Sequence, residues 1–413
     1  MKNLEDQYIE AACNCKESLA KSLCLQHQNY SYDYRWEGGA LFRLCDLINE
    51  DNLTTLAHPN IVFQASHFRC PGTNLRVPDK GDWDYFNKEI FNKFRPPFNS
   101  ERKVNIYFLE TAFEEHQALK RVSIQTRPVK NSLVGQDFGP NVQRHHGSAV
   151  VGVVSAQGGE GIPAGVCVAD LNRCVVFEVP NAHELFNVLS TINNEIKSDE
   201  VTIINCSYGL SPADITVNYE SEMRKRDIRT QLINGRLDDV CRQNCQGALG
   251  QLKELAKKNV IVVSAAGNHP NVDARVASII NFCDSIEPMG NVITVGALDT
   301  SGLMHSCSCQ NADIYAPGEY VTLHSGRVGG IAVNSGTSFS APLVTSVLAN
   351  LMTAKSDLTA SEAISIVSEN SRKEKRMLYI QPQEIYSEIA SKIKTSRTNR
   401  TTINGRGSMQ LGK

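Results

Sequence analysis

A serine at the head of an apolar helical pattern is the strongest chemical signal in the sequence. The segment Gly336 to Pro342 (GTSFSAP) delivers Ser338 to a pattern that continues to Met352. A serine at a helix N-terminus lies beside unbonded backbone N–H groups and at the positive end of the helix dipole. Such N–H groups can stabilise an oxyanion, so Ser338 is a candidate nucleophile. The alternative is that Ser338 only caps the N-terminus of a core helix.

Two further segments carry groups that a serine nucleophile needs. His146 precedes the apolar run Ala149 to Val154, and an imidazole that titrates near neutrality can act as a general base. Asn268 follows the predicted strand 260–266, and its side-chain amide can donate to an oxyanion. Each segment also fits a plainer role, as a histidine with local hydrogen bonds or as a Gly-Asn turn.

The elements around these residues predict a parallel sheet with helices on both faces. Continuous apolar runs, typical of strands buried on both faces, alternate with amphipathic helical patterns. The runs lie at 104–109, 201–205, 260–266 and 292–295, and the helical patterns at 183–196, 248–256 and 343–352. We therefore predict an α/β fold with its reactive residues at the carboxyl ends of the strands.

Together, the segments resemble the subtilisin-like serine proteases (subtilases, peptidase S8). GTSFSAP is similar to the family's Gly-Thr-Ser-x-x-x-Pro motif, His146-Gly147-Ser148 to its His-Gly-Thr/Ser motif, and Ala266-Gly267-Asn268 to its oxyanion motif. The order of acid, histidine, asparagine and serine agrees too. Residues 205–209, 291–297 and 315–318 resemble further family segments. The resemblance covers residues 101 to 375 and implies a three-layer subtilisin-like fold with a mostly parallel central sheet.

The resemblance implies a serine endopeptidase that works through an acyl-enzyme and needs no cofactor. Ser338 would attack the peptide carbonyl, His146 would take up its proton, and Asn268 with the Ser338 N–H would form the oxyanion hole. A protein or peptide substrate would bind along two segments. These are Ser207, Tyr208 and Gly209, and Ala265, Ala266 and Gly267.

The acid departs from the family pattern, in which an aspartate ends a strand before a small residue and glycine. Here Glu110 ends the predicted strand, 36 residues before His146. Serine hydrolases of other folds use glutamate, so Glu110 is chemically competent. Asp137, which follows no strand, is the alternative acid. A chain without a working acid would be a catalytically weak pseudoprotease that acts as a protein-binding scaffold.

The resemblance also bears on metal binding and specificity. The loop Gln157 to Ile162 corresponds to a calcium loop of many subtilases but offers one carboxylate, whereas Ca²⁺ prefers about six to eight oxygens, so we expect no metal site. Asp284, and less directly Glu287, would lie near the floor of the pocket for the residue before the scissile bond. A carboxylate there favours Arg or Lys. A surface role for these carboxylates is the alternative.

Composition excludes several classes of protein. The 413 residues include 42 Lys+Arg and 44 Asp+Glu, and this balance argues against nucleic-acid binding by bulk charge. No apolar run reaches the roughly 18 residues of a membrane span, and the charged start argues against a signal peptide. Thirteen cysteines, an odd number, suit a reducing compartment, so a cytoplasmic protein is expected. Cys241 and Cys245 lack the spacing of a zinc site and are interpreted as idle thiols.

Three regions are predicted along the chain. Residues 1–100 form an aromatic-rich accessory or pro-like region that would inhibit the catalytic domain, with a linker at 95–100. Residues 101–375 form the catalytic domain, within which 211–247 is a solvated helix or surface excursion. Residues 376–413 form a C-terminal extension, basic and expected to be mobile from about residue 391.

Overall fold

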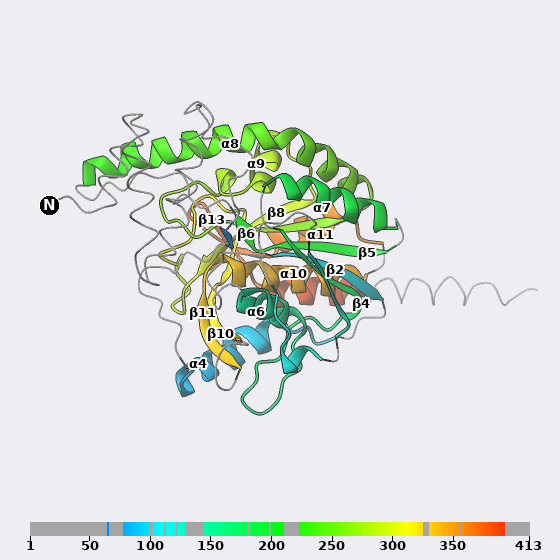
Figure 1. The fold of residues 1–413 in the computed structure, drawn as a ribbon. Coiled ribbons are helices and arrows are strands. Elements are labelled where there is room, and N and C mark those ends of the chain that lie inside the picture. Colours follow the sequence, from blue (N-terminus) through cyan, green and yellow to red (C-terminus); the bar gives the residue numbers. More distant parts are fainter. Residues whose placement is uncertain are drawn as a thin grey trace, which may run out of the picture.

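A computed structural model describes residues 64–65, 77–98, 102–110, 113–120, 122–128, 144–179, 182–197, 200–209, 223–324, 330–355 and 357–392. Within these ranges the chain forms a central sheet between two layers of helices (Figure 1). The alternative acid Asp137 and the predicted mobile tail beyond residue 392 lie outside the described residues.

Nine strands form the central sheet, in the order β12-β13-β9-β8-β7-β5-β2-β4-β3. Every neighbouring pair runs parallel except β12 and β13. The strands are β2 (Lys103–Glu110), β3 (Ile124–Pro128), β4 (Asp170–Glu178), β5 (Val201–Cys206), β7 (Ile261–Ala265), β8 (Val292–Leu298), β9 (Ile314–Pro317), β12 (Arg372–Glu374) and β13 (Met377–Tyr379). Strands β5, β7 and β8 are buried along their whole length, which explains their continuous apolar sequences. The predicted α/β fold with a mostly parallel sheet is confirmed.

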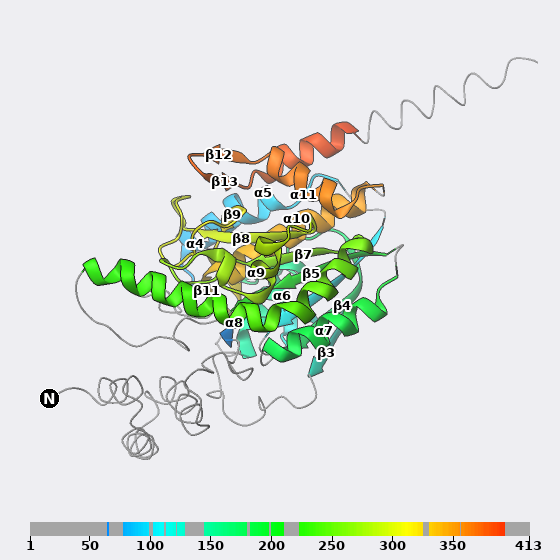
Figure 2. The ribbon, with the colours of Figure 1, turned by 90° about the horizontal axis from the view of Figure 1, so that it is seen from above.

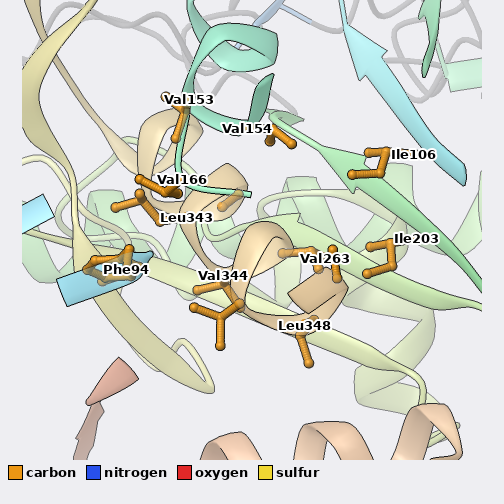
Figure 3. Close-up of a cluster of buried hydrophobic side chains, with 14 of the residues drawn as sticks. Phe94, Ile106, Val153, Val154, Val166, Ile203, Val263, Leu343, Val344 and Leu348 are labelled. Atoms are coloured by element: carbon orange, nitrogen blue, oxygen red, sulfur yellow. The ribbon is translucent and has the colours of Figure 1, made fainter. Parts of the chain in front are cut away.

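Helices cover both faces of this sheet (Figures 1 and 2). One face carries α7 (Ala182–Glu195), α8 (Met223–Lys257) and α9 (Ile279–Ile286), and the other carries α6 (Arg144–Ser155), α10 (Thr337–Ala354) and α11 (Ala360–Glu369). Side chains alternate along β2, so Ile106 and Phe108 join one apolar cluster while Tyr107 and Leu109 join the other. Figure 3 shows the first cluster, which is built around α10. The predicted helix at 183–196 is confirmed as α7, and much of the polar stretch 211–247 belongs to α8, a helix of 35 residues.

The short elements before β2 pack against the same core. They are α4 (Lys80–Tyr85), the π-helical turn η2 (Phe86–Phe91) and α5 (Asn92–Phe94). Phe86, Ile90 and Phe94 are buried in the α10 cluster, and the Tyr386 hydroxyl donates to the Phe94 carbonyl at 2.6 Å. This part of the predicted accessory region is therefore integrated with the body, while the domain division near residue 100 stays a prediction.

Two small antiparallel pairs complete the fold. Strands β10 (Glu319–Leu323) and β11 (Ile331–Ser335) form a ribbon that leads into α10. Strand β1 (Gln64–Ala65) pairs with β6 (Tyr208–Gly209). Two single 3₁₀ turns are η3 (Gln117–Leu119) and η6 (Ala274–Val276). Among the described residues, none of the helices combines the length and the hydropathy that a membrane crossing requires.

Candidate active site

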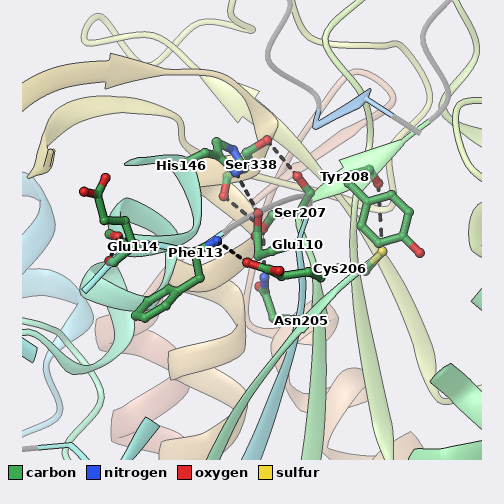
Figure 4. A network of polar contacts seen from close by, with 11 residues as sticks. Glu110, Phe113, Glu114, His146, Asn205, Cys206, Ser207, Tyr208 and Ser338 are labelled. Atoms are coloured by element: carbon green, nitrogen blue, oxygen red, sulfur yellow. Dashed lines mark hydrogen bonds and ion pairs between the residues drawn. The ribbon is translucent and has the colours of Figure 1, made fainter. Parts of the chain in front are cut away.

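The carboxyl ends of three neighbouring strands converge on the N-termini of α6 and α10. Glu110 ends β2, Ser207 follows β5, and Asn268 comes three residues after the last residue of β7. His146 lies in the first turn of α6, and Ser338 in the first turn of α10. The structure thus brings together residues that the sequence places up to 228 positions apart (Figure 4).

Glu110 and His146 form a buried side-chain pair. The Oε2 atom of Glu110 lies 2.7 Å from Nδ1 of His146, and both side chains have no exposed surface. Burial lowers the pKa of His146 to about 3, so the free imidazole is neutral near pH 7. Burial also raises the pKa of Glu110 well above its ordinary value. Its second oxygen, Oε1, has no hydrogen-bond partner among the described residues.

Ser338 is tied to the end of β5 by two reciprocal hydrogen bonds. Its hydroxyl donates to the Ser207 carbonyl at 3.0 Å, and the Ser207 hydroxyl donates to the Ser338 carbonyl at 3.1 Å. Pro342, four residues on, lacks the N–H that would bond the Ser338 carbonyl within the helix. Ser207 therefore supplies the donor that the helix cannot.

A second line of polar contacts holds Ser207 in place. Its hydroxyl accepts from Nδ2 of Asn205 at 2.8 Å, and Oδ1 of Asn205 accepts from the Thr345 hydroxyl at 3.0 Å. All three side chains are buried. Sequence reasoning missed the role of Thr345, although a polar residue within an otherwise apolar helix was an available signal.

Asn268 faces the start of α10. Its Oδ1 atom accepts from the Thr337 N–H at 2.8 Å and from the Thr337 hydroxyl at 2.9 Å. Because Oδ1 is engaged twice, Nδ2 is the half of the amide that can donate to another group. The N-cap Gly336 has a φ of 129°, and a Cβ there would lie 2.8 Å from Nδ2 of Asn268. Glycine is therefore required for the close approach of loop and amide.

The predicted substrate segments form a strand edge and the wall behind it. Tyr208 and Gly209 make up β6, which pairs with Ala65 and Gln64 respectively. A Cβ on Gly209 would lie 2.6 Å from the Ala277 carbonyl oxygen, and a Cβ on Gly267 would lie 2.9 Å from the Ala277 Cβ. Ala277 therefore closes the space behind both segments. The remaining predicted residues of the wall, Ala265 and Ala266, are fully buried at the end of β7.

The two predicted specificity carboxylates have other partners. Asp284 lies in α9, and its Oδ1 atom accepts from the Met289 N–H at 3.0 Å. Glu287 forms an ion pair with Lys253 at 2.8 Å. Their effect on specificity stays a prediction.

The loop that corresponds to a calcium site folds back on itself. Gly159 and Ile162 exchange backbone hydrogen bonds of 3.3 and 3.2 Å across it. The described part of the chain contains no group of three or more His, Cys, Asp or Glu side chains arranged for a metal ion.

Comparisons with known proteins identify the fold and the family. Residues 103–389 match the model of the subtilase family, Peptidase_S8. The nisin leader peptidase NisP from Lactococcus lactis has a similar structure, with a TM-score of 0.52, 16% identity and coverage of 74% of this chain and 93% of that chain. A structure of the subtilase cytotoxin SubAB has a TM-score of 0.51 at 16% identity, with coverage of 71% and 92%. No curated protein matches the sequence. The chain belongs to the subtilase family of serine peptidases.

Proposed function

We propose that the chain is a serine endopeptidase that uses Ser338, His146 and Glu110 as its triad and processes specific protein or peptide substrates. The observation that carries this proposal is the buried contact of 2.7 Å between Glu110 and His146. When Glu110 is ionised, Nδ1–H is directed at its carboxylate, and the lone pair of the neutral imidazole is on Nε2. This is the tautomer that a general base for serine requires.

Acylation begins when Ser338 Oγ leaves the Ser207 carbonyl and turns to His146. The His146 ring contacts the ring of Phe339, the residue after Ser338, at 5.6 Å between centroids. A rotation about the Cα–Cβ bond of Ser338 would turn its hydroxyl away from the Ser207 carbonyl and toward His146. His146 takes the proton as Oγ attacks the peptide carbonyl, and later returns it to the leaving amine. Water repeats the sequence to release the acyl group.

The oxyanion of the tetrahedral intermediate would lie between Nδ2 of Asn268 and the Ser338 N–H. Because Thr337 holds Oδ1, the amide is oriented before substrate arrives, and no reorganisation is needed at the moment of reaction. Such a donor contributes about 2.7–4 kcal/mol of transition-state stabilisation, a figure that was measured on subtilisin.

A peptide substrate would pair with β6 as an antiparallel strand. In this structure β1 already pairs with β6 in that way. We propose that the N-terminal region inhibits the enzyme in this way, so that a substrate must displace it. Such competition would favour a few well-fitting substrates, which is the basis for proposing specific processing.

A pseudoprotease that binds proteins is the second candidate. The hydrogen bond from Ser338 Oγ to the Ser207 carbonyl favours it, because in this rotamer the hydroxyl is committed to a backbone acceptor. The replacement of the usual aspartate by Glu110 points the same way.

Labelling with a fluorophosphonate probe separates the two candidates. The full chain and a chain without residues 1–76 would be compared with Ser338→Ala and with Ser340→Ala. Ser340 is a matched control, because it lies two residues away, is equally buried, and donates to the Ala316 carbonyl at 3.1 Å. Labelling that is lost in Ser338→Ala and kept in Ser340→Ala would establish the hydrolase. Folded protein that stays unlabelled in both lengths would establish the pseudoprotease.

A further inference from the structure

Three cysteines lie between α8 and α9, on the sheet face opposite to α10. Cys241 and Cys245 are one turn apart on α8, and Cys283 is on α9. The Sγ atoms of Cys245 and Cys283 are 3.0 Å apart, although the residues are 38 positions apart in sequence. All three are free thiols.

The two facing sulfurs are close to bonding distance. An S–S bond is about 2.0 Å long, so an approach of about 1 Å would join them. The contact is part of an extended packing of α8 on α9, and Cys283 Sγ also donates to the Cys245 carbonyl at 3.7 Å. The two sulfurs therefore already face one another across the contact between the helices.

We propose that Cys245 and Cys283 are a redox-reactive pair that forms a reversible disulfide between α8 and α9 when a peroxide reaches them. The Cys245 thiolate attacks the peroxide and becomes a sulfenic acid, with release of hydroxide. The Cys283 sulfur then attacks that sulfur as its proton passes to the sulfenic acid oxygen, which leaves as water. In total, two thiols are oxidised, one peroxide is reduced to two molecules of water, and one S–S bond forms.

The exposure of the two thiols determines which reacts first. Cys245 has 5% of its surface exposed, whereas Cys283 has none. Burial raises the pKa of Cys283, which disfavours its thiolate and therefore its reaction as the first of the two with peroxide. Cys241 is also fully buried, and its sulfur contacts the Val276 and Ser278 carbonyls at 3.9 Å. The Cys241 sulfur therefore contacts backbone carbonyls, and we do not include it in the reactive pair.

The crosslink would also restrain the wall behind the substrate strand. Ser278 caps the N-terminus of α9, and the preceding residue, Ala277, closes on Gly209 of β6. A fixed α9 would hold Ala277 in one position. This consequence rests on the proposed function, whereas formation of the disulfide does not.

Hydrogen peroxide applied to the purified full chain tests the proposal, with Cys245→Ser, Cys283→Ser and Cys283→Ala as variants. Cys241→Ser is the matched control, because it removes a buried thiol one turn away on the same helix. After blocking of free thiols, peptide mass spectrometry should find the Cys245 peptide joined to the Cys283 peptide. The Tm should rise by roughly 5 °C and return on reduction, because a loop of this length is closed.

The expected result is a crosslink and a reversible Tm shift in wild type and Cys241→Ser, and neither in the other variants. A Tm shift that persists in Cys283→Ala, or oxidised wild type without the joined peptides, would overturn the proposal. Folding of each reduced variant is checked by its own Tm, and Cys283→Ala replaces Cys283→Ser if the buried hydroxyl prevents folding. The KM for a peptide substrate, measured before and after oxidation, tests separately whether the disulfide affects the substrate strand β6.

Discussion

Oε2 of Glu110 and Nδ1 of His146 lie 2.7 Å apart in a part of the molecule from which solvent is excluded. The neighbouring strand β4 also ends in a glutamate, Glu178, which is in register with Glu110 of β2. Glu178 accepts from the Phe113 N–H at 3.1 Å instead. Two glutamates thus end adjacent parallel strands, and the contact with the histidine distinguishes them.

Replacement of Glu110 by Gln should lower kcat/KM by about 10⁴, the loss that follows when a triad acid can no longer select the histidine tautomer. Glu110→Asp should retain more activity than Glu110→Gln, because it keeps the charge but falls about 1.5 Å short of the imidazole. The rate of fluorophosphonate labelling compares the reactivity of the two variants with that of wild type. Glu178→Gln is the control, and it should label at the wild-type rate. Equal rates in wild type and Glu110→Gln would mean that another residue is the acid.

The same Gln variant should be more stable than wild type at high pH. Burial raises the pKa of Glu110 above its ordinary value of 4.5, so between these two values the folded state binds more protons than the unfolded state. Wild-type stability therefore falls as the pH rises through this window, and Glu110→Gln lacks that loss. The Tm difference between variant and wild type should grow as the pH rises above 4.5. If the variant is instead the less stable protein at high pH, the carboxylate is held charged by the imidazole.

His146 should change the stability with pH in the opposite direction to Glu110. Its folded pKa of about 3 lies below the ordinary value of 6.5, so the unfolded state binds more protons between them. Stability should decline as the pH falls from about 6.5, and more gently in His146→Phe, which cannot titrate. Thermal unfolding at several pH values measures this decline. Parallel curves for the two proteins would show that His146 is charged in the fold.

Asn268→Asp should lower kcat by at least 10² while the protein stays folded. The variant keeps an acceptor for Thr337 and removes the donor that faces the oxyanion, so catalysis and structure are separated. The KM should change little, because the donor acts in the transition state. Steady-state kinetics with a peptide substrate supply the measurement, and Tm supplies the structural control. A normal kcat would remove Asn268 from the oxyanion hole.

Two truncations should have opposite effects. Removal of residues 1–76 takes away β1 and should raise the rate of peptide hydrolysis, whereas removal of 1–100 also takes away Phe86, Ile90 and Phe94. Each of these buried side chains contributes about 1.5–3 kcal/mol, so the longer truncation should unfold at a much lower temperature. Adding residues 1–76 back as a separate peptide should inhibit the shorter truncation. An unchanged rate without residues 1–76 would show that β1 does not inhibit.

The fold and much of the site were predictable from local sequence. Apolar strands with helical patterns between them predicted the parallel sheet, and the resemblance to subtilases, with Glu110 at a strand end, predicted that Glu110 meets His146. The contacts that sequence reasoning missed join distant segments. The Ser207–Ser338 bonds span 131 positions, and the Tyr386–Phe94 bond spans 292. No local pattern encodes such pairs, because they arise only when the strands take their order in the sheet.

The bond from Ser207 to the Ser338 carbonyl has a consequence for the timing of synthesis. Because Pro342 leaves that carbonyl without a helical donor, α10 alone does not complete the first turn that carries the nucleophile. The turn is complete only when β5 has already formed its end of the sheet. A ribosome makes β5 long before α10, so the nucleophile segment docks onto a finished partner. A nascent chain therefore cannot assemble the proposed triad until α10 has emerged from the ribosome.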